Sequence, residues 1–214
     1  MRRLIFLILF SIPTTFLLAQ EMGEIVPPKP PIVFPPNAWG FDLMIGESGF
    51  GVGGFYRKQL NTKFTLFGDV SISEAKDERE IEYIDYLGQT FTIGKENRVF
   101  LIPFTFGAQF RLFENELADN LRPYINAGVG PTIALTTPYS KEFFKAFSYA
   151  RTHYGFGGYA GFGANFGLDK NNLIGLNVRY YYTSFLDDGV EILRGRNKKQ
   201  ISSFYITLNF GFMF

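Results

Sequence analysis

Strict alternation between apolar residues and small or polar ones is the feature that most constrains this chain. In "RVFLIPFTFGAQFRLF" (98–113), every second residue from Phe100 to Leu112 is apolar, and those between are mostly small or polar. The stretches "LIGLNVRYYYTSF" (173–185) and "SSFYITLNFGFMF" (202–214) follow the same rule. A period of two is that of a β-strand, whose successive side chains point to opposite faces. The pattern therefore predicts an all-β protein built from long, two-faced strands.

The stretch "GFGGYAGFGANFG" (155–167) raises an alternative, because Gly155 to Ala160 fit the G-x-G-x-x-A pattern of dinucleotide-binding turns. Such a turn needs a strand before it and a helix after it. Here the glycines continue at every second position beyond the motif, and no amphipathic helix follows. We interpret the stretch as one strand with a glycine-rich face.

Eight strands are predicted in total, joined by short polar turns and longer charged loops. The turns lie at 46–49, 59–63, 114–120 and 168–172, and the long loops at about 75–98, 137–153 and 185–199. The predicted strands are 38–46, 50–59, 63–74, 98–113, 121–136, 154–168, 172–184 and 200–214. Long loops at one end and short turns at the other are typical of outer-membrane barrels. The 75–98 loop is expected to extend above the membrane, and it partly alternates, as an additional hairpin would.

The volume of the apolar side chains decides whether their face of the barrel points inward or outward. A soluble ligand-binding barrel would turn that face inward, but about forty bulky side chains, roughly five per strand, exceed the interior of an eight-stranded barrel. The abundant phenylalanines (26 of 214 residues) are therefore expected to face lipid, and the glycines (23) to line the lumen. The glycines at 155–167 would leave room there for inward side chains such as Tyr181 and Tyr205.

These features together resemble the small outer-membrane β-barrels of Gram-negative bacteria, of the OmpA/OmpX type, over about 38–214. The most specific element is the last strand, "FYITLNFGFMF", and "PYINAGVGP" (123–131) is a weaker one. The resemblance implies an eight-stranded antiparallel up-and-down transmembrane barrel in the bacterial outer membrane, with both barrel termini periplasmic. It also implies that Phe210, Phe212 and Phe214 form the signal read by the barrel-insertion machinery.

The N-terminal segment is interpreted as a signal peptide. Arg2 and Arg3 precede an apolar run from Leu4 to Leu18, and cleavage is expected after Ala19. The alternative, a membrane-anchor helix, is disfavoured because Pro13 interrupts the run. Residues 20–37 are proline-rich and predict an extended periplasmic lead-in without hydrogen bonds of its own, acting as a spacer or as a ligand for a proline-recognising partner.

Composition excludes several classes of function. The chain has no cysteine and one histidine, so disulfides, thiolate sites and multi-histidine metal sites are excluded. The net charge of +1 gives no support for nucleic-acid binding. We expect a monomer without cofactor or metal, whose partners are outer-membrane lipid, including lipopolysaccharide, and the insertion machinery.

A set of polar residues falls on the inward faces of the strands. Charges in a narrow lumen of low dielectric must pair with one another. They form either a structural plug of salt bridges or the lining and gate of a small pore. The set is Asp42, Asp69, Gln109, Arg111, Arg179 and Tyr181.

Two features of the outer loops also bear on function. His153 stands at a junction of loop and strand, as the catalytic histidine does in lipid A-modifying barrels, but no serine follows two residues later and Ser184 is distant in sequence. Residues 140–151 break the alternation and predict a short amphipathic helix, capped by Ser140. Its aromatic residues, Phe143, Phe144 and Phe147, would lie on the lipid boundary, cap the barrel mouth or pack within the loop.

The sequence thus predicts an outer-membrane barrel with a structural or surface-interaction role and no enzymatic activity. A narrow pore for small or apolar solutes is the alternative, and a lipid A-modifying enzyme is a third.

Overall fold

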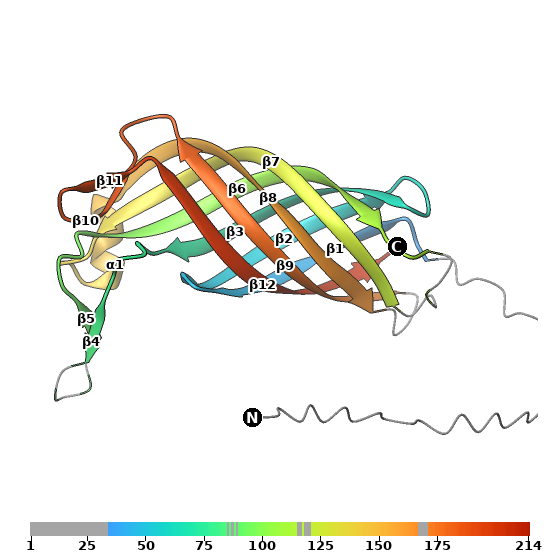
Figure 1. Cartoon of the computed structure of the whole chain (residues 1–214), viewed down its shortest axis with the longest axis horizontal. Helices are drawn as coiled ribbons and strands as arrows, with labels where there is room; N and C mark the ends of the chain where they lie inside the picture. Colours follow the sequence, from blue (N-terminus) through green and yellow to red (C-terminus); the bar gives the residue numbers. More distant parts are fainter. Residues whose placement is uncertain are drawn as a thin grey trace, which may run out of the picture. The chain divides into compact units, whose positions relative to one another are not determined.

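The computed structural model describes residues 34–84, 86, 88, 90–114, 117, 121–166 and 171–214. The predicted signal peptide and the lead-in up to residue 33 lie outside these residues. Eight long strands close into an antiparallel barrel in the order β1-β12-β9-β8-β7-β6-β3-β2 (Figure 1). The predicted eight-stranded up-and-down barrel, of the architecture known from small outer-membrane proteins, is confirmed.

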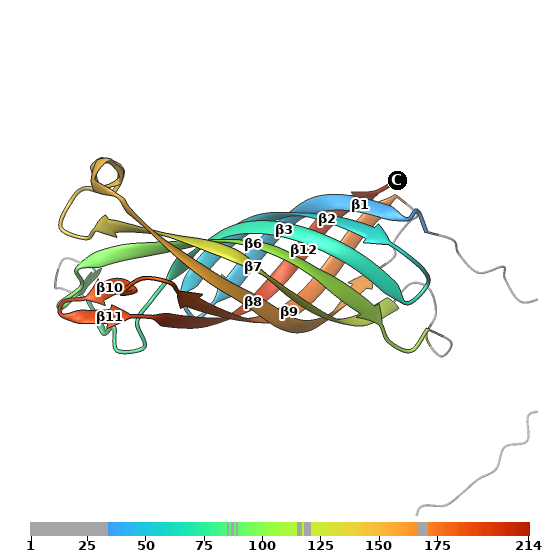
Figure 2. The ribbon, with the colours of Figure 1, turned by 90° about the horizontal axis from the view of Figure 1, so that it is seen from above.

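Each barrel strand lies within three residues of its predicted bounds. The strands are β1 (Asn37–Gly46), β2 (Gly49–Gln59), β3 (Phe64–Ala75), β6 (Asn97–Arg111), β7 (Leu121–Pro138), β8 (Arg151–Phe166), β9 (Asn172–Phe185) and β12 (Gln200–Met213). We call the end of the barrel that holds Asn37 and Met213 the terminal end, and the opposite end the loop end. The loop end carries the short β1–β2 turn and the three long loops, as Figure 2 shows from above.

The long loops contain structure of their own. The 75–98 loop holds the anticipated hairpin, β4 (Glu82–Ile84) with β5 (Thr90–Thr92), which projects away from the barrel (Figure 1). A second hairpin, β10 (Val190–Leu193) with β11 (Arg196–Lys198), was not predicted. None of the helices among the described residues is long and apolar enough to cross a membrane.

The helix of the second long loop starts later than predicted. It runs as α1 (Phe143–Ala146) and continues as the 3-10 turn η1 (Phe147–Tyr149). The predicted cap at Ser140 is wrong, because Glu142 occupies the N-cap position and no side chain caps the helix. The chain turns first, with the Lys141 N–H donating to the Pro138 carbonyl (3.4 Å), so helical geometry begins only beyond that turn.

The outer surface of the barrel is apolar. In β1, Trp39, Phe41, Leu43 and Ile45 are 39–54% exposed, whereas Asp42 between them is 1% exposed. Soluble proteins place these residue types the other way round. The orientation predicted from volume is therefore the observed one.

Some large apolar residues nevertheless point inward, contrary to the expectation that Phe, Leu and Ile all face lipid. Phe55, Phe67 and Phe185 are each 6–7% exposed and lie on the inward faces of their strands. Phe67 fits because Gly107 and Gly128 lie beside its ring: a Cβ on either would come within 2.5 and 3.0 Å of its Cζ. Inward glycines thus decide where the lumen can hold a large ring.

The side chains that occupy the space beside the glycines of strand β8 also differ from the expected ones. Tyr181 and Tyr205 are not the nearest side chains to these glycines. A Cβ on Gly155 would come 3.1 Å from Phe185, and one on Gly163 would come 3.0 Å from Tyr124. Strand β8 therefore leaves room for residues of the strands beside it.

Candidate functional site

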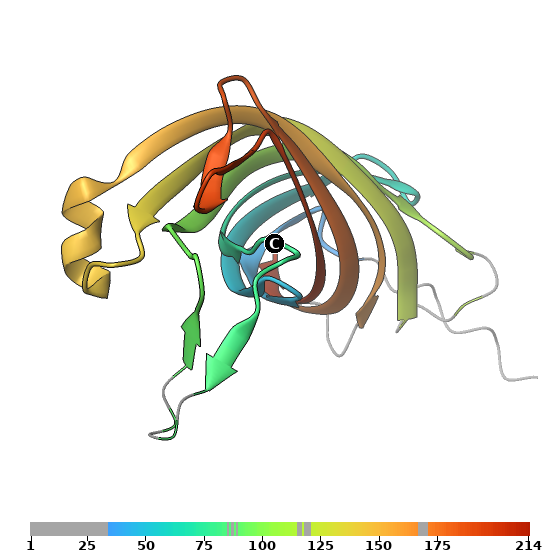
Figure 3. The ribbon, with the colours of Figure 1, turned by 60° about the vertical axis from the view of Figure 1, so that its left-hand side comes forward.

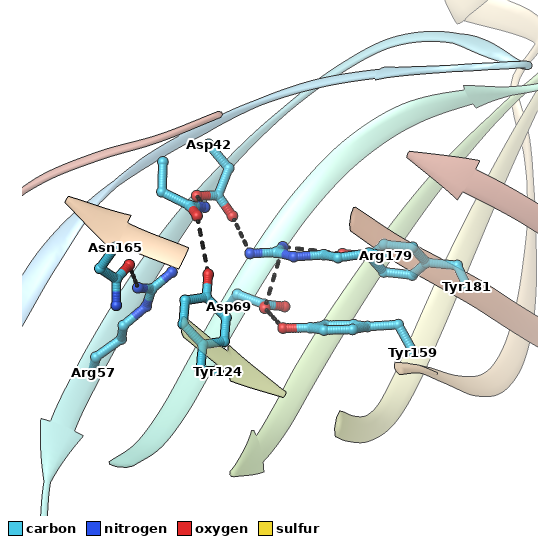
Figure 4. Close-up of polar contacts among 9 residues, drawn as sticks. Asp42, Arg57, Asp69, Tyr124, Tyr159, Asn165, Arg179 and Tyr181 are labelled. Carbon is cyan, nitrogen blue, oxygen red and sulfur yellow. Dashed lines mark hydrogen bonds and ion pairs between the residues drawn. The ribbon is translucent and has the colours of Figure 1, made fainter. Parts of the chain in front are cut away.

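Three charged side chains meet in the middle of the lumen and form what we call the central ionic cluster (Figure 4). An Nη of Arg179 lies 2.9 Å from an Oδ of Asp42, and its other Nη lies 3.7 Å from an Oδ of Asp69. All three side chains are at most 3% exposed. The residues come from β9, β1 and β3, and β9 and β3 are separated around the barrel by β8, β7 and β6. Arg179 therefore bridges opposite walls of the lumen.

Aromatic residues complete the surroundings of this cluster. The Tyr159 hydroxyl donates to Asp69 (2.8 Å), and Arg179 donates to the Tyr181 hydroxyl (3.3 Å). The Arg179 guanidinium also lies 4.9 Å from the centre of the Tyr159 ring, and the rings of Tyr159 and Tyr181 are 4.8 Å apart. Hydrogen bonds and cation–π contacts of this kind compensate a buried guanidinium for its lost hydration.

Hydrogen bonds continue from the cluster toward the terminal end. Asn209 donates to Asp42 and accepts from the Tyr124 hydroxyl (3.4 Å). Below it, Arg57 donates to Asn165 (3.2 Å), and its guanidinium lies over the ring of Phe55 (4.3 Å). Sequence reasoning missed Arg57, although its place in the alternating run Gly51, Gly53, Phe55, Arg57 marks it as inward-facing.

The terminal end of the lumen is closed by apolar side chains. Phe34 packs against a buried group made of Ala38, Phe55, Leu173 and Met213. The Arg122 guanidinium lies 3.8 Å from the centre of the Phe34 ring. The Pro36 carbonyl accepts a hydrogen bond from the Gln59 N–H (2.6 Å). The described end of the proline-rich lead-in is thus bonded to the barrel, whereas the rest of the predicted extended segment, up to residue 33, lies outside the described residues.

At the loop end, apolar side chains of the hairpin strand β10 pack into the barrel and form what we call the apolar stopper. Val190 and Ile192 of the hairpin strand β10 are fully buried, and they pack against β6 and β7. Both residues contribute to one continuous buried cluster that spans five barrel strands. The cluster consists of Ala75, Val99, Leu101, Ala134, Phe185, Val190, Ile192 and Ile201.

Ion pairs and backbone bonds hold this hairpin in place. Asp77, in the loop after β3, lies 3.3 Å from the Lys198 ammonium and 3.5 Å from the Arg196 guanidinium, and we call these three residues the loop latch. Burial works against ionisation of Asp77, but the Arg79 N–H and the charge of Lys198 hold the pKa of its carboxyl below the usual range. The latch lies beside an open hollow of about 580 Å³ at the loop end.

Two members of the predicted lumen set lie apart from the central ionic cluster. In the β3–β6 ladder Asp69 pairs with Thr105, and Gln109 and Arg111 follow four and six residues further along β6. They therefore occupy positions nearer the terminal end. Gln109 is buried there and Arg111 is half-buried.

His153 is paired with an acid that sequence reasoning did not identify. Its Nδ1 lies 2.7 Å from an Oδ of Asp187, whose other Oδ accepts from the Gly189 N–H (2.8 Å). Burial opposes ionisation of Asp187, but these two contacts hold its pKa below the usual range. In the β8–β9 ladder, Gly155 pairs with Phe185, which points inward, and Ser184 pairs with the next residue of β8 and points outward. His153, two residues before Gly155, has the inward direction. His153 and Ser184 thus lie on opposite faces of the wall.

The remaining predicted residues lie on the outside. Phe212 and Phe214 are 56% and 58% exposed at the terminal end, and Phe210 stacks on Phe41 at 5.4 Å. Their role as an insertion signal stays a prediction. The helix with Phe143 lies to the side of the barrel rather than over its mouth (Figure 3).

No protein-family model matches the chain, and no curated protein matches it. The chain is similar to solved bacterial β-barrels. The N-terminal β-barrel domain of Pseudomonas aeruginosa OprF has a TM-score of 0.47 and 14% identity, over 83% of this chain and 97% of that one. Neisserial surface protein A has a TM-score of 0.47 and 12% identity, over 83% and 94%. Ail of Yersinia pestis, solved with the heparin analogue sucrose octasulfate, has a TM-score of 0.43 and 14% identity, over 82% and 95%. At these values the likeness says nothing about what this chain binds or does.

Proposed function

We propose that this chain is a closed β-barrel of the bacterial outer membrane, with a structural role or a role in surface interaction. Its apolar outer surface suits a lipid environment, and a closed barrel leaves no backbone edge unpaired in lipid. We further propose that it is not an enzyme, because Ser184 and His153 lie on opposite faces of the wall.

The apolar stopper carries the proposal of a closed barrel. Val190 and Ile192 are fully buried over the lumen, and the central ionic cluster blocks it a second time. Phe34 and its neighbours close the terminal end. A solute would therefore have to displace an apolar cluster and a buried ion pair, so the loop surface is the part available to partners.

Single-channel recording in a planar bilayer tests this proposal. The chain from Gln20 would be refolded in detergent, with heat-modifiable gel mobility as the control for folding. We expect no openings from the folded protein. Stable, discrete openings would show that the barrel is a pore.

A narrow, gated pore is the second candidate, and buried polar atoms below the stopper favour it. Both amide atoms of Asn177, the Thr207 hydroxyl and the Asn126 carbonyl oxygen have no hydrogen-bond partner among the described residues. Buried polar groups of this kind bind water, so they mark a hydrated path. In this candidate, Arg179 is the gate.

Arg179→Ala distinguishes the two candidates. If Arg179 is a gate, the folded variant conducts while the natural protein remains silent. If the stopper closes the barrel independently, the folded variant is silent as well, and the gate hypothesis is wrong. Replacing Val190–Lys198 by a short turn in the same variant should then be required for conductance.

A further inference from the structure

The loop of α1 and η1 folds down against the outside of the barrel wall. The ring of Phe100, from the outward face of β6, stacks on Phe147 with 5.8 Å between centroids. It also meets Phe143 edge-on at 6.3 Å, and Phe143 meets Phe144 edge-on at 5.3 Å. The helix is therefore attached to the apolar outer surface of the barrel. It does not cover the mouth, which β10 closes.

The height of this attachment follows from strand geometry. Phe110, ten residues further along β6, packs on Phe64 at 5.0 Å near the terminal end. Ten residues at about 3.3 Å each, tilted by about 40°, rise roughly 25 Å along the barrel axis. The apolar band of an outer-membrane barrel is about 25 Å tall. If Phe110 stands at one edge of this band, Phe100 and the helix stand at the other.

The aromatic residues of the loop remain uncovered after this packing. Phe144 is 81% exposed, and Phe143 and Phe147 are 44% and 40% exposed. Together with Phe100 they extend the apolar outer surface sideways from the wall. Rings at this height are a recurrent feature of both edges of membrane barrels.

Basic side chains border these rings and the tyrosines beside them, and the Arg98 guanidinium lies 5.9 Å from the centre of the Phe143 ring. The Arg98 guanidinium lies 4.6 Å from the centre of the Tyr139 ring, and the Lys141 ammonium lies 5.6 Å from that of Tyr149. The Lys145 side chain is 80% exposed and paired with Glu142 (3.0 Å). Apolar rings with cations beside them match the boundary between acyl chains and anionic head groups.

We propose that Phe143, Phe144 and Phe147 form an aromatic anchor that binds the outer leaflet of the membrane in which the barrel sits. The anchor rests on the proposed membrane location, and it adds a lateral contact beyond the barrel wall. It fixes the height and tilt of the barrel at the side of β6 and β7. The neighbouring cations contact the lipid head groups.

Quenching of tryptophan fluorescence by brominated phospholipids tests the anchor. Trp39 is the only tryptophan of the chain, and it is 54% exposed on the outer wall near the terminal end. The natural protein in brominated vesicles therefore reports whether the barrel is in the bilayer. The double variant Trp39→Phe/Phe144→Trp reports on the anchor, at a site exposed enough to accept an indole.

We expect lipids brominated near the head of the acyl chain to reduce the fluorescence of Trp39→Phe/Phe144→Trp about twofold, as for a ring at the bilayer interface. The matched control is Trp39→Phe/Arg194→Trp. Arg194 lies in the turn between β10 and β11, the hairpin that packs over the lumen, and its side chain is 83% exposed, so this control should be unquenched.

The outcomes separate the two proposals. If Trp39 is quenched and the Phe144→Trp site is not, the anchor is wrong and the membrane location stands. If Trp39 itself is unquenched in a heat-modifiable, folded protein, the membrane location fails and the anchor fails with it. Equal quenching at Phe144→Trp and Arg194→Trp would overturn the anchor as a specific contact.

Discussion

The central ionic cluster and the loop latch are built from similar groups in opposite settings. In the first, Arg179 pairs with Asp42 and Asp69 inside the barrel, and none of these three side chains is more than 3% exposed. In the second, the Asp77 side chain is also only 1% exposed, but its partners Arg196 and Lys198 are 39% and 19% exposed. One cluster joins rigid strands across the lumen, and the other joins two loops beside an open hollow.

The difference decides what each cluster can do. Charges removed from water must be paired, and removing one partner leaves the others uncompensated. An ion pair whose cations already reach water contributes less, because solvent solvates those cations when the pair breaks. The central ionic cluster is therefore suited to hold the fold, and the loop latch is suited to open only at low pH, where Asp77 becomes protonated.

The largest expected effect follows from removal of the buried cation. Arg179→Met leaves Asp42 and Asp69 facing one another without a positive charge. We expect the free energy of unfolding to fall by about 3–5 kcal/mol. Urea titration in lipid vesicles, followed by heat-modifiable mobility, measures this loss.

A neutral triple variant separates pairing from packing. In Asp42→Asn/Asp69→Asn/Arg179→Met no charge is left unpaired, so most of the lost stability should return. A single Arg179→Met variant as stable as the natural protein would show that the cluster does not stabilise the fold.

An intermediate effect is expected from the packing of the lumen. In Gly107→Ala the new Cβ would come 2.5 Å from Phe67 Cζ and 2.2 Å from the Ala127 carbonyl oxygen. Overpacking of this kind costs about 1–3 kcal/mol. The same titration on Gly54→Ala is the matched control, because its Cβ would meet only the Gly40 carbonyl oxygen, at 3.7 Å. Equal stability of the two variants would contradict a tightly filled lumen.

How far the sequence could predict these features depends on the range of the interactions. Alternation is local, so it predicted all eight barrel strands and the inward direction of Asp42, Asp69 and Arg179. It could not predict which of these charges meet, because that depends on the register of strands far apart in the sequence. Arg111 shows this, since it lies on the inward face of β6 but nearer the terminal end than the central ionic cluster.

The outer loops were predicted least well, also for a physical reason. Strand β10 has Val190 and Ile192 in alternation, but the pattern spans only four residues, which is too short to distinguish a hairpin from a loop. Its burial comes from contacts with β6 and β7 that no local pattern encodes. Asp187, the partner of His153, was missed because the pair joins the start of β8 to a loop 34 residues further along the chain.

The smallest expected effect concerns the loop latch and depends on pH. The pKa of Asp77 is lowered in the folded protein. Its contribution to stability is therefore fully present above its unfolded pKa of about 3.9, and is lost as the pH falls through the lower, folded pKa. Hydrogen exchange of the backbone amides of β10 and β11, corrected for intrinsic rates, should accelerate about fivefold on acidification to pH ~3, as expected for a loss of about 1 kcal/mol.

Asp77→Asn should show the same fivefold acceleration already at neutral pH, with a much smaller acid step. Asp187, in the loop that carries β10 and β11, also has a lowered pKa, so it adds a pH dependence of its own to the exchange of the hairpin. Asp187→Asn is therefore the matched control, because it keeps the acid step that comes from Asp77. If the acid step persists in Asp77→Asn and disappears in Asp187→Asn, the pair of His153 and Asp187, rather than the loop latch, controls the hairpin. Since β10 supplies Val190 and Ile192 to the apolar stopper, whichever carboxylate controls the hairpin also determines how the stability of the stopper depends on pH.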